Sequence, residues 1–198
     1  LGLGYEEMRK VKPDLVYFSN TGFGATGPWR LYSGTGSLLE QTCGMSQFTG
    51  YLGGDPRRIG GAWVDIHTGW MAVFAILSAL HYRNQTGEGQ WIDFGMYQMG
   101  VSTMGDAVLD WIANGRNGEP RGNRHPFQAP HGVYRCRGKD QWIAIATETD
   151  QQWTALVQVM ANPSWIQDPK FGDPLSRWHH QVEIDHLLEQ WTQGYEHR

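Results

Sequence analysis

The sequence predicts an α/β protein built from two domains. In the first part of the chain, short apolar runs typical of strands lie at 15–18 and 91–94, on either side of an apolar helix. Between residues 114 and 130 a polar segment rich in Gly, Pro and Arg interrupts this pattern, as is typical of a domain boundary. After the boundary we expect a hairpin of strands at 132–135 and 142–146.

The remaining elements are predicted from caps, breakers and periodicity. A first helix ends at Lys12, where Pro13 stops it, and the strand at 15–18 leads into a glycine-rich loop, Thr21–Pro28. Further helices are expected over 37–45, from Asp65 to about Arg83, over 96–113, over about 151–161 and over about 179–192. The apolar stretch Trp70–Leu80 is shorter than the roughly 20 residues that a bilayer requires. We therefore interpret it as part of a buried helix and expect no membrane partner.

Charge and cysteine usage narrow the functional classes. The 198 residues carry a formal net charge of −4, and no run of Lys or Arg is longer than two, so nucleic acid is not an expected partner. The two cysteines, Cys43 and Cys136, form no C-x-x-C pair, which favours a reduced, cytoplasmic setting.

Motifs for metals and nucleotides are weak in this sequence. The pairs His125/His131 and His179/His180 lack the spacing of metal ligands, so no metal is expected. Gly22–Gly27 spells G-x-G-x-x-G, but Pro28 follows at once and no long helix is expected there, so the motif lacks the context of a dinucleotide site. Neither a P-loop motif nor the G-x-S-x-G elbow of hydrolases is present.

Asp65 is the strongest candidate for chemistry. It lies between Gly60-Gly61 and Thr68-Gly69, where we expect it to be the N-cap of the apolar helix. The amides of a helix start favour an anionic carboxylate, and such a carboxylate can attack an activated acyl group. Position alone leaves an ordinary helix cap as the alternative.

Three segments together resemble one enzyme family. They are SNTGFGATGP (19–28), GGAWVDIHTGWMAVFAILSALHYRNQTGEGQWIDFGM (60–96) and RGNRHPFQAPHGVYRC (121–136). Their order and spacing resemble the family III CoA-transferases, also called the CaiB–BaiF family. The most specific part is an aspartate before a small-residue helix that ends in R-x-x-T-G-x-G-Q.

The resemblance implies a fold and partners. Members have a large Rossmann-like domain and a smaller α+β domain, and two chains interlock as a homodimer. Residues 1–115 are expected to belong to the large domain, and residues 116–198 to the linker and part of the small domain. We expect the chain to be a fragment that lacks roughly the first and last quarters of a typical member. Coenzyme A is implied as a substrate, with an acyl-CoA and a carboxylic acid as partners and no permanently bound cofactor.

The resemblance also implies roles for individual residues. Asp65 is expected to be the nucleophile that carries CoA as an aspartyl-CoA thioester. Candidates for contacts with the oxyanion or the substrate are Gly22, Gly24, Gly60, Gly61, Asn123, Arg124 and His125. Arg124 is expected to meet the carboxylate of the acceptor; capping of the interdomain loop is the alternative.

Two other functions stay open. Racemases of the family for 2-methylacyl-CoA use a histidine about thirty residues before the aspartate, and here that position is Thr35, which is no base. Asp150 lies near the place of a racemase glutamate in the small domain. A non-catalytic CoA-binding or assembly fragment is the alternative from another class.

Overall fold

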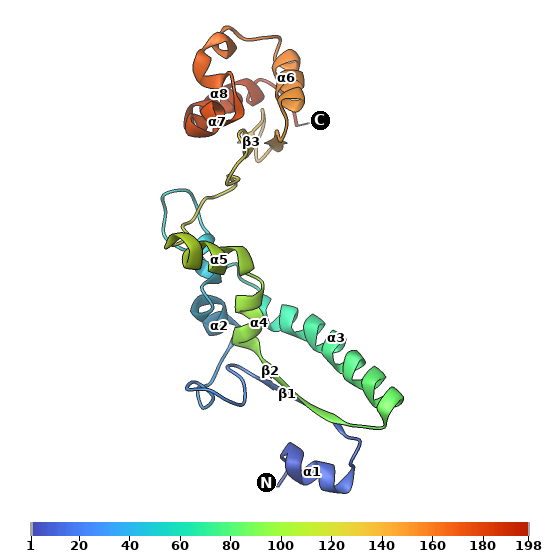
Figure 1. The fold of residues 1–198 in the computed structure, drawn as a ribbon. Helices are drawn as coiled ribbons and strands as arrows, with labels where there is room; N and C mark the ends of the chain where they lie inside the picture. The colour runs from blue at the N-terminus through green and yellow to red at the C-terminus, as the bar shows by residue number, and fades with distance from the viewer. Residues whose placement is uncertain (1, 198) are drawn as a thin grey trace. The chain divides into compact units, whose positions relative to one another are not determined.

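A computed structural model describes residues 2–197 (Figure 1). The chain divides into two compact units, one reaching Pro120 and the other starting at Arg121. Each unit has its own sheet and its own hydrophobic core, so each is described by itself.

The first unit is built around a parallel pair of strands, β1 (Val16–Thr21) and β2 (Gln90–Gly95). Helix α3 (Trp63–Thr86) belongs to the connection between them and packs beside both strands (Figure 1). Parallel strands require such a crossover, because a tight hairpin joins only antiparallel ones. The expected strand–helix–strand order is confirmed, with both strands longer than predicted.

Shorter helices complete the first unit. Helix α1 (Tyr5–Val11) precedes β1, and α2 (Gly36–Thr42) with the 3₁₀ turn η1 (Met45–Phe48) precedes α3. Helix α2 lies against α3, and both contribute to a small core formed by Phe23, Leu39, Val64 and Met96. The core therefore joins the glycine-rich loop after β1 to α2, to the start of α3 and to Met96, which follows β2.

The predicted long helix over 96–113 is wrong, because it is broken into α4 (Met96–Ser102) and α5 (Gly105–Asn114). The amide and the hydroxyl of Thr103 both donate to the carbonyl of Gly100, at 3.3 and 2.7 Å. These short-range bonds close the end of α4, and Gly105 begins the next helix. Threonine and glycine are poor helix formers, so the break follows local chemistry.

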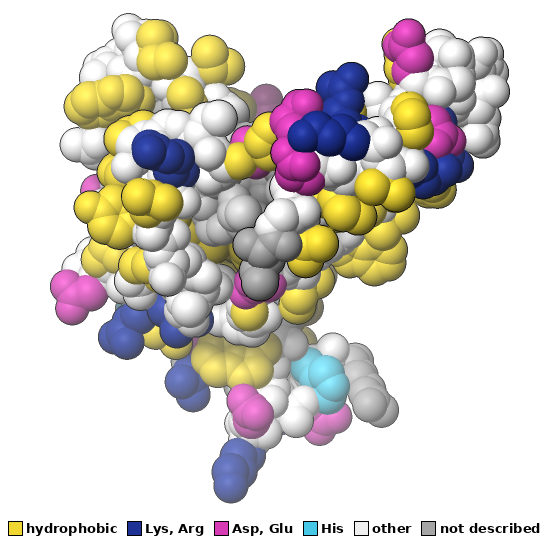
Figure 2. Space-filling model, turned by 90° about the horizontal axis from the view of Figure 1, so that it is seen from below, with side chains coloured by type: hydrophobic (Ala, Val, Ile, Leu, Met, Phe, Trp, Pro, Cys, Tyr) yellow, Lys and Arg dark blue, Asp and Glu magenta, His cyan; other side chains and the backbone are white. Residues whose placement is uncertain are grey.

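Helix α3 is mostly exposed, so its prediction as a buried helix is wrong for the residues that the structure describes. Only Val64, Thr68, Ala72 and Ala79 are buried on it. Figure 2 shows many hydrophobic side chains on the face of the molecule in view. On α3, the large exposed hydrophobic residues are Ile66, Trp70, Met71, Val73, Phe74, Leu77 and Tyr82. By length and composition α3 is also apolar enough to cross a membrane, a property shared by core helices of soluble proteins.

The second unit begins with an antiparallel hairpin, β3 (His131–Arg135) and β4 (Trp142–Ala146), as predicted. Helices α6 (Asp150–Val159), α7 (Pro174–His179) and α8 (Gln181–Thr192) follow, with the 3₁₀ turns η2 (Ser164–Gln167) and η3 (Pro169–Phe171) before α7. Its core includes Tyr134, Trp153, Phe171, Ile184 and Leu188. The short α7 was not predicted as a separate helix; Asp173 caps it, and Pro174 opens it.

Candidate active site

Asp65 lies in the first turn of α3 with its side chain exposed. It is the third residue of the helix, so the prediction that it is the N-cap is wrong. The N-cap is Ala62, whose backbone is left-handed with φ 52° and whose side chain has no oxygen to cap the helix. The carboxylate of Asp65 is therefore not used as a cap within the part of the chain that the structure describes.

Gly36, the first residue of α2, faces this carboxylate. A Cβ built on Gly36 would lie 1.6 Å from Oδ2 of Asp65 and 2.7 Å from its Cγ. Such distances are far inside van der Waals contact, so the carboxylate occupies space that only a glycine leaves open. Helix α2 thus forms one wall of the site.

Gly36 was not among the residues predicted from the sequence. The available signal was the run Gly34-Thr35-Gly36 directly before a helical pattern. Gly36 is not among the residues with positive φ, so its lack of a side chain serves close approach rather than a turn.

The turn before α3 has an unusual backbone. Gly60, Gly61 and Ala62 follow one another in the left-handed region, with φ of 86°, 63° and 52°. In the described residues, no group accepts a hydrogen bond from the amides of Gly60 or Gly61. These two predicted residues therefore bring free N–H donors to the same turn that leads into Asp65.

Gly22 and Gly24 lie in the loop after β1 and shape it. A Cβ on Gly22 would come within 2.9 Å of the Cα of Gly34, so the two backbones touch. The carbonyl of Gly22 accepts a hydrogen bond from the amide of Tyr97 at 2.9 Å. Gly24 has φ 88°, and its amide donates to Oγ1 of Thr21 at 2.9 Å. The Gly24 amide is thus already used inside the loop.

Asp93 on β2 holds the next residue of that loop. Both of its carboxylate oxygens accept from the amide of Ala25, at 2.9 and 3.0 Å.

The loop also borders a small depression of about 250 Å³, lined by Phe23, Thr26, Gly27, Pro28, Trp29, Tyr97 and Gln98. The carboxyl ends of the two parallel strands therefore meet at a fixed loop, a common place for ligands in α/β proteins.

The other predicted site residues belong to the second unit, where each has an internal contact. Arg124 donates from Nε and Nη2 to Oδ2 of Asp185 at 3.2 and 2.8 Å, and the Tyr134 hydroxyl donates to Oδ1 of the same carboxylate at 2.8 Å. The carbonyl of Asn123 lies 2.6 Å from Nδ1 of His131, and Nδ1 of His125 accepts from the amide of Phe127 at 3.2 Å. The arginine therefore ties the start of this unit to α8.

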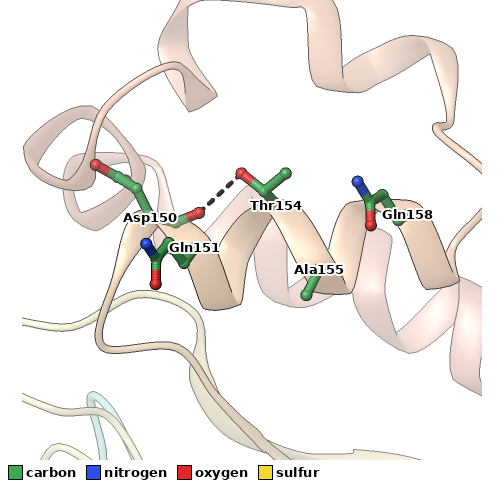
Figure 3. A pocket seen from close by; sticks show the side chains of 5 residues that line it. All are labelled: Asp150, Gln151, Thr154, Ala155 and Gln158. Carbon is green, nitrogen blue, oxygen red and sulfur yellow. Dashed lines mark hydrogen bonds between the residues drawn. The ribbon is translucent and has the colours of Figure 1, made fainter.

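Asp150, the carboxylate noted for the racemase alternative, begins α6. It borders an open depression of about 370 Å³ along that helix, with Gln151, Thr154, Ala155 and Gln158 (Figure 3). Its carboxylate pairs with the guanidinium of Arg177, which is itself buried and lies over the ring of Trp153. Asp150 is thus engaged in the structure of the second unit.

No group of three or more His, Cys, Asp or Glu side chains suited to a metal ion occurs among residues 2–197. The first turn of α3 thus offers an exposed carboxylate, and the turn that leads into it offers two backbone amides without an acceptor in the described residues, a combination that suits acyl transfer.

Comparison with known proteins places the chain in a family. The profile of CoA-transferase family III matches residues 1–197. Succinyl-CoA–D-citramalate CoA-transferase of Chloroflexus aurantiacus is 34% identical over 98% of this chain and 48% of the relative. Acetyl-CoA:oxalate CoA-transferase of Acetobacter aceti is 33% identical over 96% of this chain and 48% of the relative.

A solved structure agrees with these relatives. A CaiB/BaiF family protein from Brucella suis superimposes with a TM-score of 0.87 at 31% identity, over 98% of this chain and 51% of that one. The chain thus spans about half the length of the relatives it matches. Over that span, the chain belongs to CoA-transferase family III.

Proposed function

We propose that the full-length protein containing this chain transfers CoA from an acyl-CoA thioester to a free carboxylic acid, with Asp65 as the nucleophile. The observation that carries the proposal is the exposed carboxylate of Asp65 in the first turn of α3, a helix that follows directly on the turn with the free amides of Gly60 and Gly61. Membership of the family supports the reaction class.

The reaction begins with Asp65. Its carboxylate oxygen attacks the thioester carbonyl carbon, the C–S bond breaks, and a mixed anhydride and CoA thiolate form. The thiolate then attacks the aspartyl carbonyl of the anhydride, which releases the donor acid and leaves an aspartyl-CoA thioester.

The second half repeats these steps in reverse order. The acceptor carboxylate attacks the aspartyl-CoA thioester, which frees the thiolate and forms a new anhydride. Attack of the thiolate on the acceptor's acyl carbon then gives the new acyl-CoA and regenerates the Asp65 carboxylate. Each step displaces one group by one nucleophile, and no redox partner is required.

Each tetrahedral intermediate carries an oxyanion. The amides of Gly60 and Gly61 are the donors that we assign to it, since stabilisation of such a charge by fixed N–H groups typically accounts for about 3–4 kcal/mol per donor. Gly22 and Gly24 act as scaffold, because their loop is already bonded to Thr21, Tyr97 and Asp93.

The nature of the acceptor is also part of the proposal. Three relatives act, by their names, on citramalate, oxalate and glutarate, the third being succinate–glutarate CoA-transferase of Agrobacterium fabrum at 30% identity. These are dicarboxylic acids, so we infer a short dicarboxylate as acceptor. Asn123, Arg124 and His125 remain candidates for its second carboxylate, with Arg124 exchanging Asp185 for the substrate.

The assembly follows the family. Residues up to about 115 form part of a large Rossmann-like domain, residues from 116 onward form the linker and part of a small domain, and two full-length chains interlock as a homodimer in the cytoplasm. Coenzyme A enters as a substrate and no cofactor is bound permanently.

The test uses the full-length protein with labelled acyl-CoA and a panel of mono- and dicarboxylates. We expect label in a new acyl-CoA, and a CoA adduct on the peptide that contains Asp65 by mass spectrometry after rapid quenching. Turnover with CoA never attached to that peptide contradicts the role of Asp65, and absence of any transfer across the panel contradicts the reaction class.

A further inference from the structure

Helix α2 contains a carboxylate that the proposed reaction does not use. Glu40 is fully buried, with no exposed side-chain area. Its Oε1 accepts a short hydrogen bond from the amide of Ile59. Its Oε2 has no hydrogen-bond partner among the described residues, and the nearest cation is Nε of Arg58 at 3.9 Å. Burying a charged group costs free energy unless its contacts compensate, so this position calls for a reason.

The position of Glu40 on α2 supplies one. Gly36 and Glu40 are four residues apart and both are buried on the same helix. Residues at this spacing lie on one helical face. Gly36 meets the carboxylate of Asp65, and Glu40 bonds the amide of Ile59. One face of α2 therefore holds both ends of the segment from 59 to 65.

The held segment is the strained turn of the site. Gly60, Gly61 and Ala62 all have positive φ, and a non-glycine residue keeps that conformation only where its surroundings enforce it. A Cβ at Gly36 would lie 3.2 Å from Cβ of Ala62, so α2 also touches the turn in its middle. Without the bond at Ile59, the chain before Gly60 is free to relax.

We propose that Glu40 is a positioning residue for the reaction: by fixing the amide of Ile59, it holds the Asp65 carboxylate toward the reacting carbonyl carbon and the Gly60 and Gly61 amides toward the oxygen of that carbonyl. It touches no substrate and acts through the turn. The proposal rests on Asp65 being the nucleophile, and it adds a residue outside the reacting groups.

Two substitutions of Glu40 separate the effect of side-chain length from the effect of charge. Glu40→Gln keeps an oxygen at the same reach and removes the charge, whereas Glu40→Asp keeps the charge and shortens the side chain by one methylene. The kcat of the full-length protein is expected to stay within about 3-fold for Gln and to fall by roughly 10- to 100-fold for Asp, since a misplacement of about 1 Å costs up to ~10²-fold. The KM for acyl-CoA is expected to change by less than about 3-fold in both, because binding of the substrate is untouched.

Two control variants accompany them. Arg58→Gln removes only a distant, partly exposed partner of Glu40 and should leave kcat unchanged. Thr192→Val removes the hydrogen bond that the Thr192 hydroxyl donates to the carbonyl of Arg135 at 2.6 Å in the second unit, so it should lower Tm without changing kcat. A loss of kcat in step with Tm across all variants would mean that Glu40 is merely structural and overturns the proposal, as does normal kcat in Glu40→Asp.

The formation of the CoA adduct on Asp65 distinguishes the two proposals. If the wild-type protein forms no CoA adduct on Asp65, the proposed function itself is contradicted. If the adduct forms at the wild-type rate in Glu40→Asp, only the positioning role of Glu40 is contradicted. If Glu40→Asp does not fold, Glu40→Met, which fills a similar volume without an acceptor, takes its place. If neither folds, amide exchange at Ile59 in the wild type decides: protection well above that of Gly60 supports the proposal, and equal exchange overturns it.

Discussion

The carboxylate of Asp65 occupies the place that a side chain at Gly36 would need, with only 1.6 Å between Oδ2 and a Cβ built on the glycine. Two helices that are separate in sequence thus share one space, and the missing side chain of one admits the reactive group of the other. The fit also explains why a glycine, and no residue with a side chain, begins α2.

The first prediction follows from that fit. Gly36→Ala is expected to reduce transfer activity by about 10²-fold or more, because the carboxylate must turn away from the new methyl group. The fold should survive, since the displaced atoms are the end of a side chain. Steady-state kinetics and a thermal melt of the full-length protein check this.

Gly105→Ala is the matched control. Gly105 also begins a helix, α5, but no atom lies within 4 Å of a Cβ built there. Its activity should equal that of the wild type. Equal activity of Gly36→Ala and Gly105→Ala would contradict the site as described.

The second prediction concerns Asp65 itself. Asp65→Ala is expected to remove the covalent pathway, with a loss of at least ~10³-fold, and no CoA adduct should form. Stability should fall by only about 0.3–1 kcal/mol, the interaction of an acidic residue with the helix start, because the side chain caps nothing. Activity assays and denaturant unfolding measure the two effects separately; near-normal turnover would exclude Asp65 as nucleophile.

The order of strands and helices was predictable because it depends on local patterns. The strand that ends at Thr21, the helix that Gly87 ends and the β3–β4 hairpin all have punctuating residues that are visible in the sequence. The break between α4 and α5 was missed because its cause, the bonding of Thr103 to Gly100, competes only weakly with an otherwise helical pattern.

The site was only partly predictable, for a different reason. Asp65, Gly60 and Gly61 are close in sequence, so a motif reveals them together. Gly36 and Glu40 act across a helix–helix contact, and no local pattern encodes which glycine meets which carboxylate. The exposure of α3 could not be deduced either, because periodicity indicates an apolar helix without naming what covers it.

The third prediction is a pH dependence of stability in the second unit. Burial first, and then the adjacent Asp185 carboxylate, raise the pKa of Tyr134 well above its ordinary value of 10.0. The folded state therefore favours the neutral phenol. Its contribution to the free energy of unfolding is complete below pH 10.0 and is lost as the pH rises above that value, by up to about 1.4 kcal/mol per pH unit.

Tyr134→Phe tests it. The variant should be less stable at neutral pH by about 1 kcal/mol, for the lost hydrogen bond to Asp185, and should lose less stability than the wild type above pH 10.0. Denaturant titrations of the full-length protein at a series of pH values measure both the stability difference at neutral pH and the loss of stability above pH 10.0. Parallel pH profiles for the two proteins would show that Tyr134 titrates normally.

The fourth prediction concerns assembly. Trp70, Phe74 and Leu77 are exposed on α3, and an apolar surface of this kind is normally covered in a folded protein. We expect the full-length protein to be a homodimer that does not dissociate on dilution. Light scattering over a concentration series checks this, and a stable monomer at all concentrations would contradict it.

The last prediction separates CoA transfer from racemisation of a 2-methylacyl-CoA. Inversion at the α-carbon requires a base on each face of that carbon, and a general base works best with a pKa near the operating pH. Thr35 lies directly before Gly36 and uses its hydroxyl oxygen to accept a hydrogen bond from the amide of Leu38 at 3.4 Å, as the N-cap of α2. A threonine hydroxyl is no base at neutral pH, so Thr35 cannot supply the second base opposite Asp65. The full-length protein should therefore take up no α-deuterium from deuterated water at a catalytic rate, while it still moves CoA to a free carboxylate. Thr35→Ala should retain transfer, because its role is that of a helix cap, at a cost of about 1 kcal/mol in stability. Rapid deuterium uptake that persists after every carboxylate acceptor is removed would overturn the transferase assignment in favour of the racemase.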